Sequence, residues 1–227
     1  MNTFSIKEAL GFGWRTTKQY FLFLVGLLVI VFAISFLFSW LFRVTADMNS
    51  ALGFVAWIAD MVVSILIGMG IIYILLEFCD HKVPAYKDLI QPYPLFFKYL
   101  VASIFYGLVV CVGFILFIIP GIFLAVKYSM YRYLVIDKGL GPVEALTKSG
   151  EITYGAKWKL LGYGIIVGLI NIGGALLFGV GLFVTIPITM IATAYVYRTL
   201  LRGGGMAARE QVVPTASQAP LPEAPNG

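Results

Sequence analysis

The chain has 227 residues, of which 60% are hydrophobic and only 12% charged, and its mean hydropathy is +0.94. This balance lies far outside that of soluble domains and predicts a polytopic membrane protein. A crossing helix needs about 20 residues, so six crossings use most of the length and exclude a separate catalytic domain outside the membrane.

The net charge of +5 could indicate a nucleic-acid partner, but the lysines and arginines lie beside apolar runs and not on a polar module. This placement is typical of side chains that meet lipid headgroups. The sequence therefore favours anionic lipid as a partner over nucleic acid.

Residues 1–19 are polar enough to stay outside the membrane, and Ser5 and Glu8 have the spacing of a helix capping box. We expect an amphipathic cytoplasmic helix there. The apolar runs that follow predict an all-α bundle of six transmembrane helices over residues 20–202, with short amphipathic interfacial helices on the cytoplasmic side. The approximate spans are 20–42, 51–76, 99–119, 121–136, 160–177 and 180–201. Residues 203–227 are rich in Gly, Ala, Pro and polar residues, which predicts a disordered cytoplasmic tail.

The fourth predicted span begins at Pro120 and Gly121 and is short for a crossing, at about 16 residues. A tilted neighbour, a thinned bilayer or a re-entrant path would each accommodate such a length. All three arrangements stay open at this point.

The basic residues also predict an orientation. If both termini lie on one side, Arg43 is the only basic residue on the other side. The positive-inside rule then places both termini in the cytoplasm. One pattern occurs three times along the chain: an amphipathic segment, then a basic residue close to an aromatic one, then two spans. The basic and aromatic residues are Lys18 and Tyr20, Lys98 and Tyr99, and Lys157 and Trp158. A weak internal repeat and a chance pattern of interfacial residues both explain this.

Four residues are candidate intramembrane polar sites: Asp60, Ser64, Lys127 and Asn171. Asp60 lies about nine residues inside its span, where a charge costs several kcal/mol unless it is paired or neutralised. Lys127 has a similar predicted depth, so an ion pair with Asp60 is one hypothesis and a protonated, hydrogen-bonded Asp60 is the other. Small and polar residues at helical spacing along the spans are typical of packing faces in lipid, and a polar pathway is the alternative.

A cytoplasmic basic interface is predicted at Arg132, Lys148, Lys157, Trp158 and Lys159. Arg132 is near enough to the end of its span to reach headgroups or a loop carboxylate such as that of Asp137.

No catalytic residue, cofactor or metal site is predicted. Cys79, Asp80 and His81 are adjacent, so their side chains do not converge on one helix face, and an ordinary loop is favoured over a metal site. His81 is the only histidine, which leaves no Ser-His or Cys-His arrangement away from that loop. The chain also lacks the phosphate-binding and HExxH motifs.

One stretch of the chain resembles a known family. The residues that carry the resemblance are Pro120, Gly121, Lys127, Arg132, Asp137, Gly141, Glu144, Ala145, Leu146, Ser149, Thr153, Gly155 and Trp158. They are similar to the central pattern of a broad group of bacterial six-span membrane proteins, mostly uncharacterised, which includes the membrane domain attached to some glycerophosphoryl diester phosphodiesterases. The resemblance covers residues 95–165 well and the rest only in hydropathy and length.

The resemblance implies a six-helix protein of the bacterial inner membrane and offers no catalytic residues. It does not imply phosphodiesterase activity, because the soluble catalytic barrel is absent from this chain. We therefore predict a membrane protein without enzymatic activity, an accessory or organising module that contacts anionic lipid, a partner membrane protein or both through its basic cytoplasmic face. The alternative is a small transporter or channel with a polar path through Asp60 and Asn171.

Overall fold

The computed structural model describes residues 4–48, 50–176, 179 and 181–212, and for residues 46–48, 50 and 204–212 it describes the backbone alone. Within these residues the chain forms helices and no strand, which confirms the all-α class. Five helices are long and apolar enough to cross a membrane, as expected of a multi-pass membrane protein. These candidate spans are Phe21–Thr45, Ala51–Cys79, Tyr86–Leu116, Lys157–Leu176 and Leu182–Gly203.

The helices follow one another with short connections. In chain order they are α1 (Ile6–Gln19), α2 (Phe21–Met48), α3 (Ser50–Cys79), the short η1 (Tyr86–Leu89) and η2 (Tyr93–Leu95), α4 (Phe96–Leu116), α5 (Ile118–Tyr128), α6 (Tyr131–Lys138), α7 (Pro142–Ile152), α8 (Lys157–Leu176) and α9 (Leu182–Val212).

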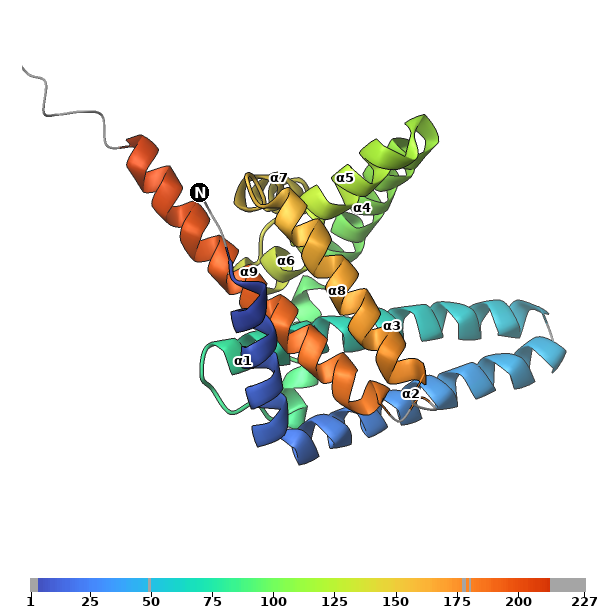
Figure 1. Cartoon of the computed structure of the whole chain (residues 1–227). Coiled ribbons are helices and arrows are strands. Elements are labelled where there is room, and N and C mark those ends of the chain that lie inside the picture. The colour runs from blue at the N-terminus through green and yellow to red at the C-terminus, as the bar shows by residue number, and fades with distance from the viewer. Residues whose placement is uncertain (1–3, 49, 177–178, 180, 213–227) are drawn as a thin grey trace, which may run out of the picture.

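Two helical hairpins project from a common base as separate arms (Figure 1). The α2–α3 arm extends to the right of the view and the α4–α5 arm to the upper right. Helices α8 and α9 form a third hairpin, and α1 packs along α9. Helix α1 therefore lies beside α9, the last helix that the structure describes.

The buried core lies in the base, where the end of α3, the start of α4 and helices α6, α7 and α9 meet. Its most buried large side chains include Met69, Ile74, Tyr131, Leu134, Val135, Ile152, Ile191, Tyr197 and Leu200. Tyr133 of α6 and Tyr197 of α9 stack there, with 5.2 Å between their ring centroids. Burial of this apolar surface stabilises the base.

The arms, in contrast, expose large apolar side chains. On the α2–α3 arm the exposed side chains include Phe32, Phe36, Trp40, Phe54 and Trp57. At the tip of the α4–α5 arm, Ile115, Leu116, Phe117, Ile118 and Ile119 are all exposed. Apolar surface of this extent is typical of contact with lipid or with another protein.

Helix α1 begins as its sequence predicts, because the Oγ of Ser5 accepts a hydrogen bond from the backbone N–H of Glu8 at 3.3 Å. Its buried face is made of small residues, Ala9, Gly13 and Thr16, that pack towards α9. Gly13 lies directly against the carbonyl oxygen of Ile188, so a Cβ atom would not fit there. The missing side chain of Gly13 lets the backbones of α1 and α9 approach closely at this point.

The predicted fourth span, 121–136, is not a single helix. Helix α5 ends at Tyr128 and α6 begins at Tyr131, with a turn at Ser129 and Met130. Helix α7, which follows, buries Ala145 and Leu146 in the base.

The chain end also differs from the prediction. The backbone of α9 continues as a helix through Val212, past residue 203, where the disordered tail was expected to begin. Residues 213–227 of that predicted tail lie outside the described residues.

Candidate functional site

A groove of about 500 Å³ lies between α5 and the first turns of α8. Its lining is apolar apart from one cation and consists of Ile119, Pro120, Ile122, Phe123, Val126, Lys157, Trp158 and Leu161. We call this feature the α5–α8 groove. Two of the predicted basic-interface residues, Lys157 and Trp158, therefore lie together at one apolar surface.

The local sequence explains both walls of the groove. Ile119, Ile122, Phe123 and Val126 follow the i, i+3, i+4, i+7 spacing of one helix face, so α5 presents a continuous apolar stripe. On α8, Leu161 follows Lys157 by one turn and therefore lies on the same face. Trp158 is 81% exposed at the edge of the groove.

Lys157 has aromatic neighbours but no acidic partner. Its Nζ lies 4.3 Å from the ring centroid of Phe123 and 5.5 Å from that of Tyr154. Cation–π contacts hold the ammonium group in place without neutralising it. Among the described residues, no carboxylate forms an ion pair with Lys157. The ammonium is thus available to an external anion.

Buried hydroxyl groups of α7 and of its C-cap residue, Thr153, fix the C-terminal end of α5. The Oγ of Ser149 accepts a hydrogen bond from the N–H of Met130 at 3.1 Å and donates to the carbonyl oxygen of Lys127 at 3.2 Å. Thr153 Oγ1 donates to the same carbonyl oxygen at 2.9 Å. These bonds satisfy backbone groups that the break between α5 and α6 would otherwise leave unpaired. They also hold α5, and with it one wall of the groove, in a defined position.

The other predicted basic-interface residues do not join this groove. Lys159 Nζ lies 5.6 Å from the ring of Phe4, in a different hollow that Lys7 and Glu8 also line. Lys148 forms an exposed ion pair with Glu151 at 2.8 Å. The structure therefore spreads these cations over several faces.

Arg132 does not reach Asp137, contrary to one expectation from the sequence. Its Nε donates a hydrogen bond to the hydroxyl of Tyr131 at 3.1 Å, and its side chain is exposed. The carboxylate of Asp137 instead binds other residues in the base.

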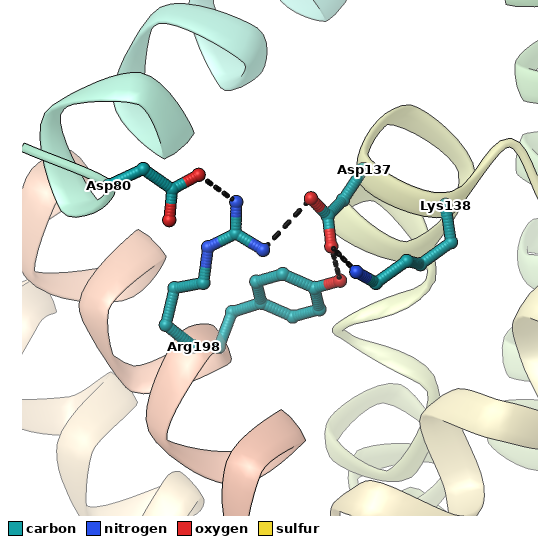
Figure 2. Close-up of polar contacts among 5 residues, drawn as sticks. Asp80, Asp137, Lys138 and Arg198 are labelled. Atoms are coloured by element: carbon teal, nitrogen blue, oxygen red, sulfur yellow. Dashed lines mark hydrogen bonds and ion pairs between the residues drawn. The ribbon is translucent and has the colours of Figure 1, made fainter. Parts of the chain in front are cut away.

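Those residues form an ionic cluster that the sequence analysis missed, shown in Figure 2. Arg198 of α9 bridges two carboxylates, with 2.6 Å to Asp80 and 2.8 Å to Asp137. The Tyr197 hydroxyl donates to Asp137 at 2.9 Å, and Lys138 lies 3.3 Å from the same carboxylate. Two cations balance two anions, so the cluster is neutral and ties the ends of α3 and α6 to the middle of α9. The sequence did carry one signal of this cluster. Asp80, Asp137 and Arg198 lie near the ends of three predicted spans on the same predicted side of the membrane, and their charges are opposite.

The intramembrane candidates are dispersed. Asp60 is half-buried on the α2–α3 arm, Ser64 is exposed on the same helix, and neither has a hydrogen bond or ion pair with another described residue. Lys127 turns its Nζ over the ring of Tyr128, at 4.8 Å, and lies against Gly150. The structure therefore contains no Asp60–Lys127 ion pair within the part of the chain it describes.

Asn171 belongs to a row of polar side chains between α8 and α9. Its Nδ2 donates to Thr189 Oγ1 at 3.3 Å, and Tyr163 and Thr193 share a hydrogen bond of 2.9 Å nearer the base. The Oδ1 of Asn171 and the Oγ1 of Thr185 are buried with no hydrogen-bond partner among the described residues. This row holds the two helices together in an apolar setting.

The Cys79–Asp80–His81 run forms the end of α3 and its turn. Cys79 is buried, His81 has a positive φ of 58°, and Asp80 binds Arg198. Over the described residues, no group of three or more His, Cys, Asp and Glu side chains gathers as a metal site would require.

Comparison of the chain with protein-family models, with curated proteins and with solved structures finds no match. The resemblance of residues 95–165 to the bacterial six-span group therefore stays a prediction. Several residues that carry it have clear structural positions: Gly121 lies against Phe114, Ser149 and Thr153 bind the end of α5, and Gly155 has a φ of 79°.

Proposed function

We propose that this chain is an integral protein of the bacterial inner membrane that binds anionic lipid and acts as an accessory or organising module, without enzymatic activity of its own. The observation that carries the proposal is the unpaired ammonium group of Lys157 at the edge of an apolar groove, beside the exposed Trp158. Lysine and tryptophan are typical of the level at which acyl chains meet headgroups.

The proposed orientation places the base and both termini on the cytoplasmic side. In this orientation the α2–α3 and α8–α9 hairpins cross the bilayer and the α4–α5 arm enters it from the base. Helix α5 has 11 residues and is about 16 Å long, roughly half of the 30 Å hydrocarbon layer. We therefore propose that the candidate span Tyr86–Leu116 belongs to a re-entrant arm, which leaves four crossings in place of the six predicted from hydropathy.

The exposed apolar surface of the α2–α3 arm supports a second part of the proposal, a partner membrane protein. Asp60 lies half-buried on this arm without a partner among the described residues. A polar side chain in lipid gains stability from a hydrogen bond to a neighbouring helix, which a partner could supply.

The alternative function, a small transporter or channel, is favoured by the unpaired polar atoms of Asn171 and Thr185 between α8 and α9. Buried polar groups without partners are unusual and can mark a site that water or a substrate occupies. The weakness of this alternative is that Asp60 lies on a separate arm, so the two residues proposed for one path are not brought together.

Native mass spectrometry of the detergent-solubilised protein tests the leading proposal by measuring retained lipids. The Lys157→Gln/Lys159→Gln double variant should retain less anionic lipid than the unaltered chain, because two cations near the membrane surface are lost. Unchanged retention would refute lipid binding at this face. An Asn171→Leu variant is the control, since it alters the proposed transport path and leaves both lysines in place.

A further inference from the structure

We propose that the α5–α8 groove is a specific site for one anionic phospholipid, with an acyl chain lying along α5 and the phosphate group at Lys157. This inference rests on the proposed function and deepens it. It assigns lipid recognition to a single groove and not to the general positive charge of the base.

The apolar wall favours an acyl chain as the occupant. The stripe on α5 runs from Val126, near the base, to Ile119, which is 80% exposed near the tip of the arm. A small soluble anion would leave this wall exposed to water, whereas a hydrocarbon chain would cover it. The open edge at Ile119 and Trp158 also lets a lipid enter sideways from the bilayer.

The charge distribution favours an anionic headgroup. Lys157 is the one cation in the groove lining, and its ammonium group lies near the rings of Phe123 and Tyr154. An ammonium group has three N–H donors, and its contacts with aromatic rings leave these donors without an oxygen acceptor. A phosphate group at this position would receive those hydrogen bonds and balance the charge.

Lys159 provides a matched control because it lies in the same helix turn but lines a different hollow, with Lys7 and Glu8. The two substitutions, Lys157→Gln and Lys159→Gln, remove the same charge from the chain. We expect Lys157→Gln to reduce retention of phosphatidylglycerol about fivefold relative to phosphatidylcholine, and Lys159→Gln to change it little.

The experiment reconstitutes the full chain in nanodiscs of phosphatidylglycerol and phosphatidylcholine in equal amounts, and native mass spectrometry then counts the lipids kept after the disc is removed. Ile122→Trp tests the apolar wall, because the larger ring should fill the groove and displace the acyl chain of either lipid. Leu108→Trp is its control, since Leu108 is exposed on the same arm but does not line the groove.

The outcomes separate the inference from the proposed function. If Lys157→Gln and Lys159→Gln reduce anionic lipid equally, the groove is not a specific site although the basic face still binds lipid. If neither these variants nor the double variant changes retention, both proposals are wrong. A second copy of the chain bound in place of lipid, and lost in Ile122→Trp, would overturn the assignment to lipid.

Discussion

Arg198 is the residue on which the ionic cluster of the base depends. Its side chain is 14% exposed and that of Asp137 is 11% exposed, so this pair is shielded from water. Removing one member of a buried pair leaves the other charge without compensation, and that cost exceeds the net gain from forming the pair. Arg198 bridges two carboxylates, so its loss affects both at once.

We expect Arg198→Leu to lower the free energy of unfolding by about 3 kcal/mol, because Asp137 and Asp80 would lose their shared cation. Lys148→Gln is the control: its exposed pair with Glu151 should contribute less than about 1 kcal/mol. Unfolding in detergent with increasing dodecyl sulfate measures both variants. Equal, small losses would show that the cluster does not stabilise the base.

At the same scale, the sequence identified some candidate residues and misassigned others. Lys157 and Trp158 could be recognised because a basic-aromatic pair at the start of an apolar run is a local pattern. The partner of Asp137 could not be recognised, because Arg198 is 61 positions later and Arg132 only five positions earlier. Proximity along the chain suggested the wrong arginine.

The break between α5 and α6 is the clearest difference between expectation and structure at the scale of elements. The turn at Ser129 and Met130 contains neither Gly nor Pro, so the local sequence gives no sign of it. The N–H of Met130 and the carbonyl oxygen of Lys127 are bonded by Ser149 of α7 and by Thr153, its C-cap residue, about 20 residues later. A helix end that distant side chains stabilise cannot be read from local periodicity.

Two hydrogen bonds fix the position of the α4–α5 arm. The Tyr106 hydroxyl donates to the carbonyl oxygen of Ala125 at 3.3 Å, and the Tyr131 hydroxyl donates to Ser103 Oγ at 3.1 Å. The first bond joins α4 to α5, and the second joins α4 to Tyr131 at the start of α6. Phe117 is the one non-helical residue between α4 and α5, so the turn leaves few backbone groups unpaired.

We expect the tip of this arm to stay within the hydrocarbon layer. In a Cys111→Ala background, Ile118→Cys should resist a membrane-impermeant maleimide added from either side of the membrane. Val83→Cys, in the exposed connection after α3, should react from the cytoplasmic side. Labelling is read from the mass shift of the protein. Reaction of Ile118→Cys from the periplasmic side would instead show that the arm crosses.

At the scale of the whole molecule, the base and the arms have different physical requirements. The base buries its own apolar side chains and carries the ionic cluster, whereas the arms expose theirs. In water the exposed arms would be unfavourable, and in a bilayer they meet acyl chains. This division accounts for the compact base and diverging arms of Figure 1.

The orientation predicted from the basic residues is tested with reporters at both ends of the chain. Fusions at the N-terminus and at the C-terminus should both give the signal of a cytoplasmic reporter, because Arg43 is the only basic residue placed on the opposite side. A periplasmic signal from either end would show that the proposed arrangement of hairpins is inverted or wrong. It would also remove the basis for lipid binding at a cytoplasmic face.

The sequence by itself determined the all-α class, the long apolar helices and the position of Lys157 and Trp158 beside an apolar run. These are properties of composition and spacing within a single segment. Only the tertiary structure decided the break after Tyr128, the pairing of Arg198 with Asp80 across 118 positions, and the groove between α5 and α8. The physical reason is that each of these depends on groups from separate segments, which meet only when the helices of the base pack together.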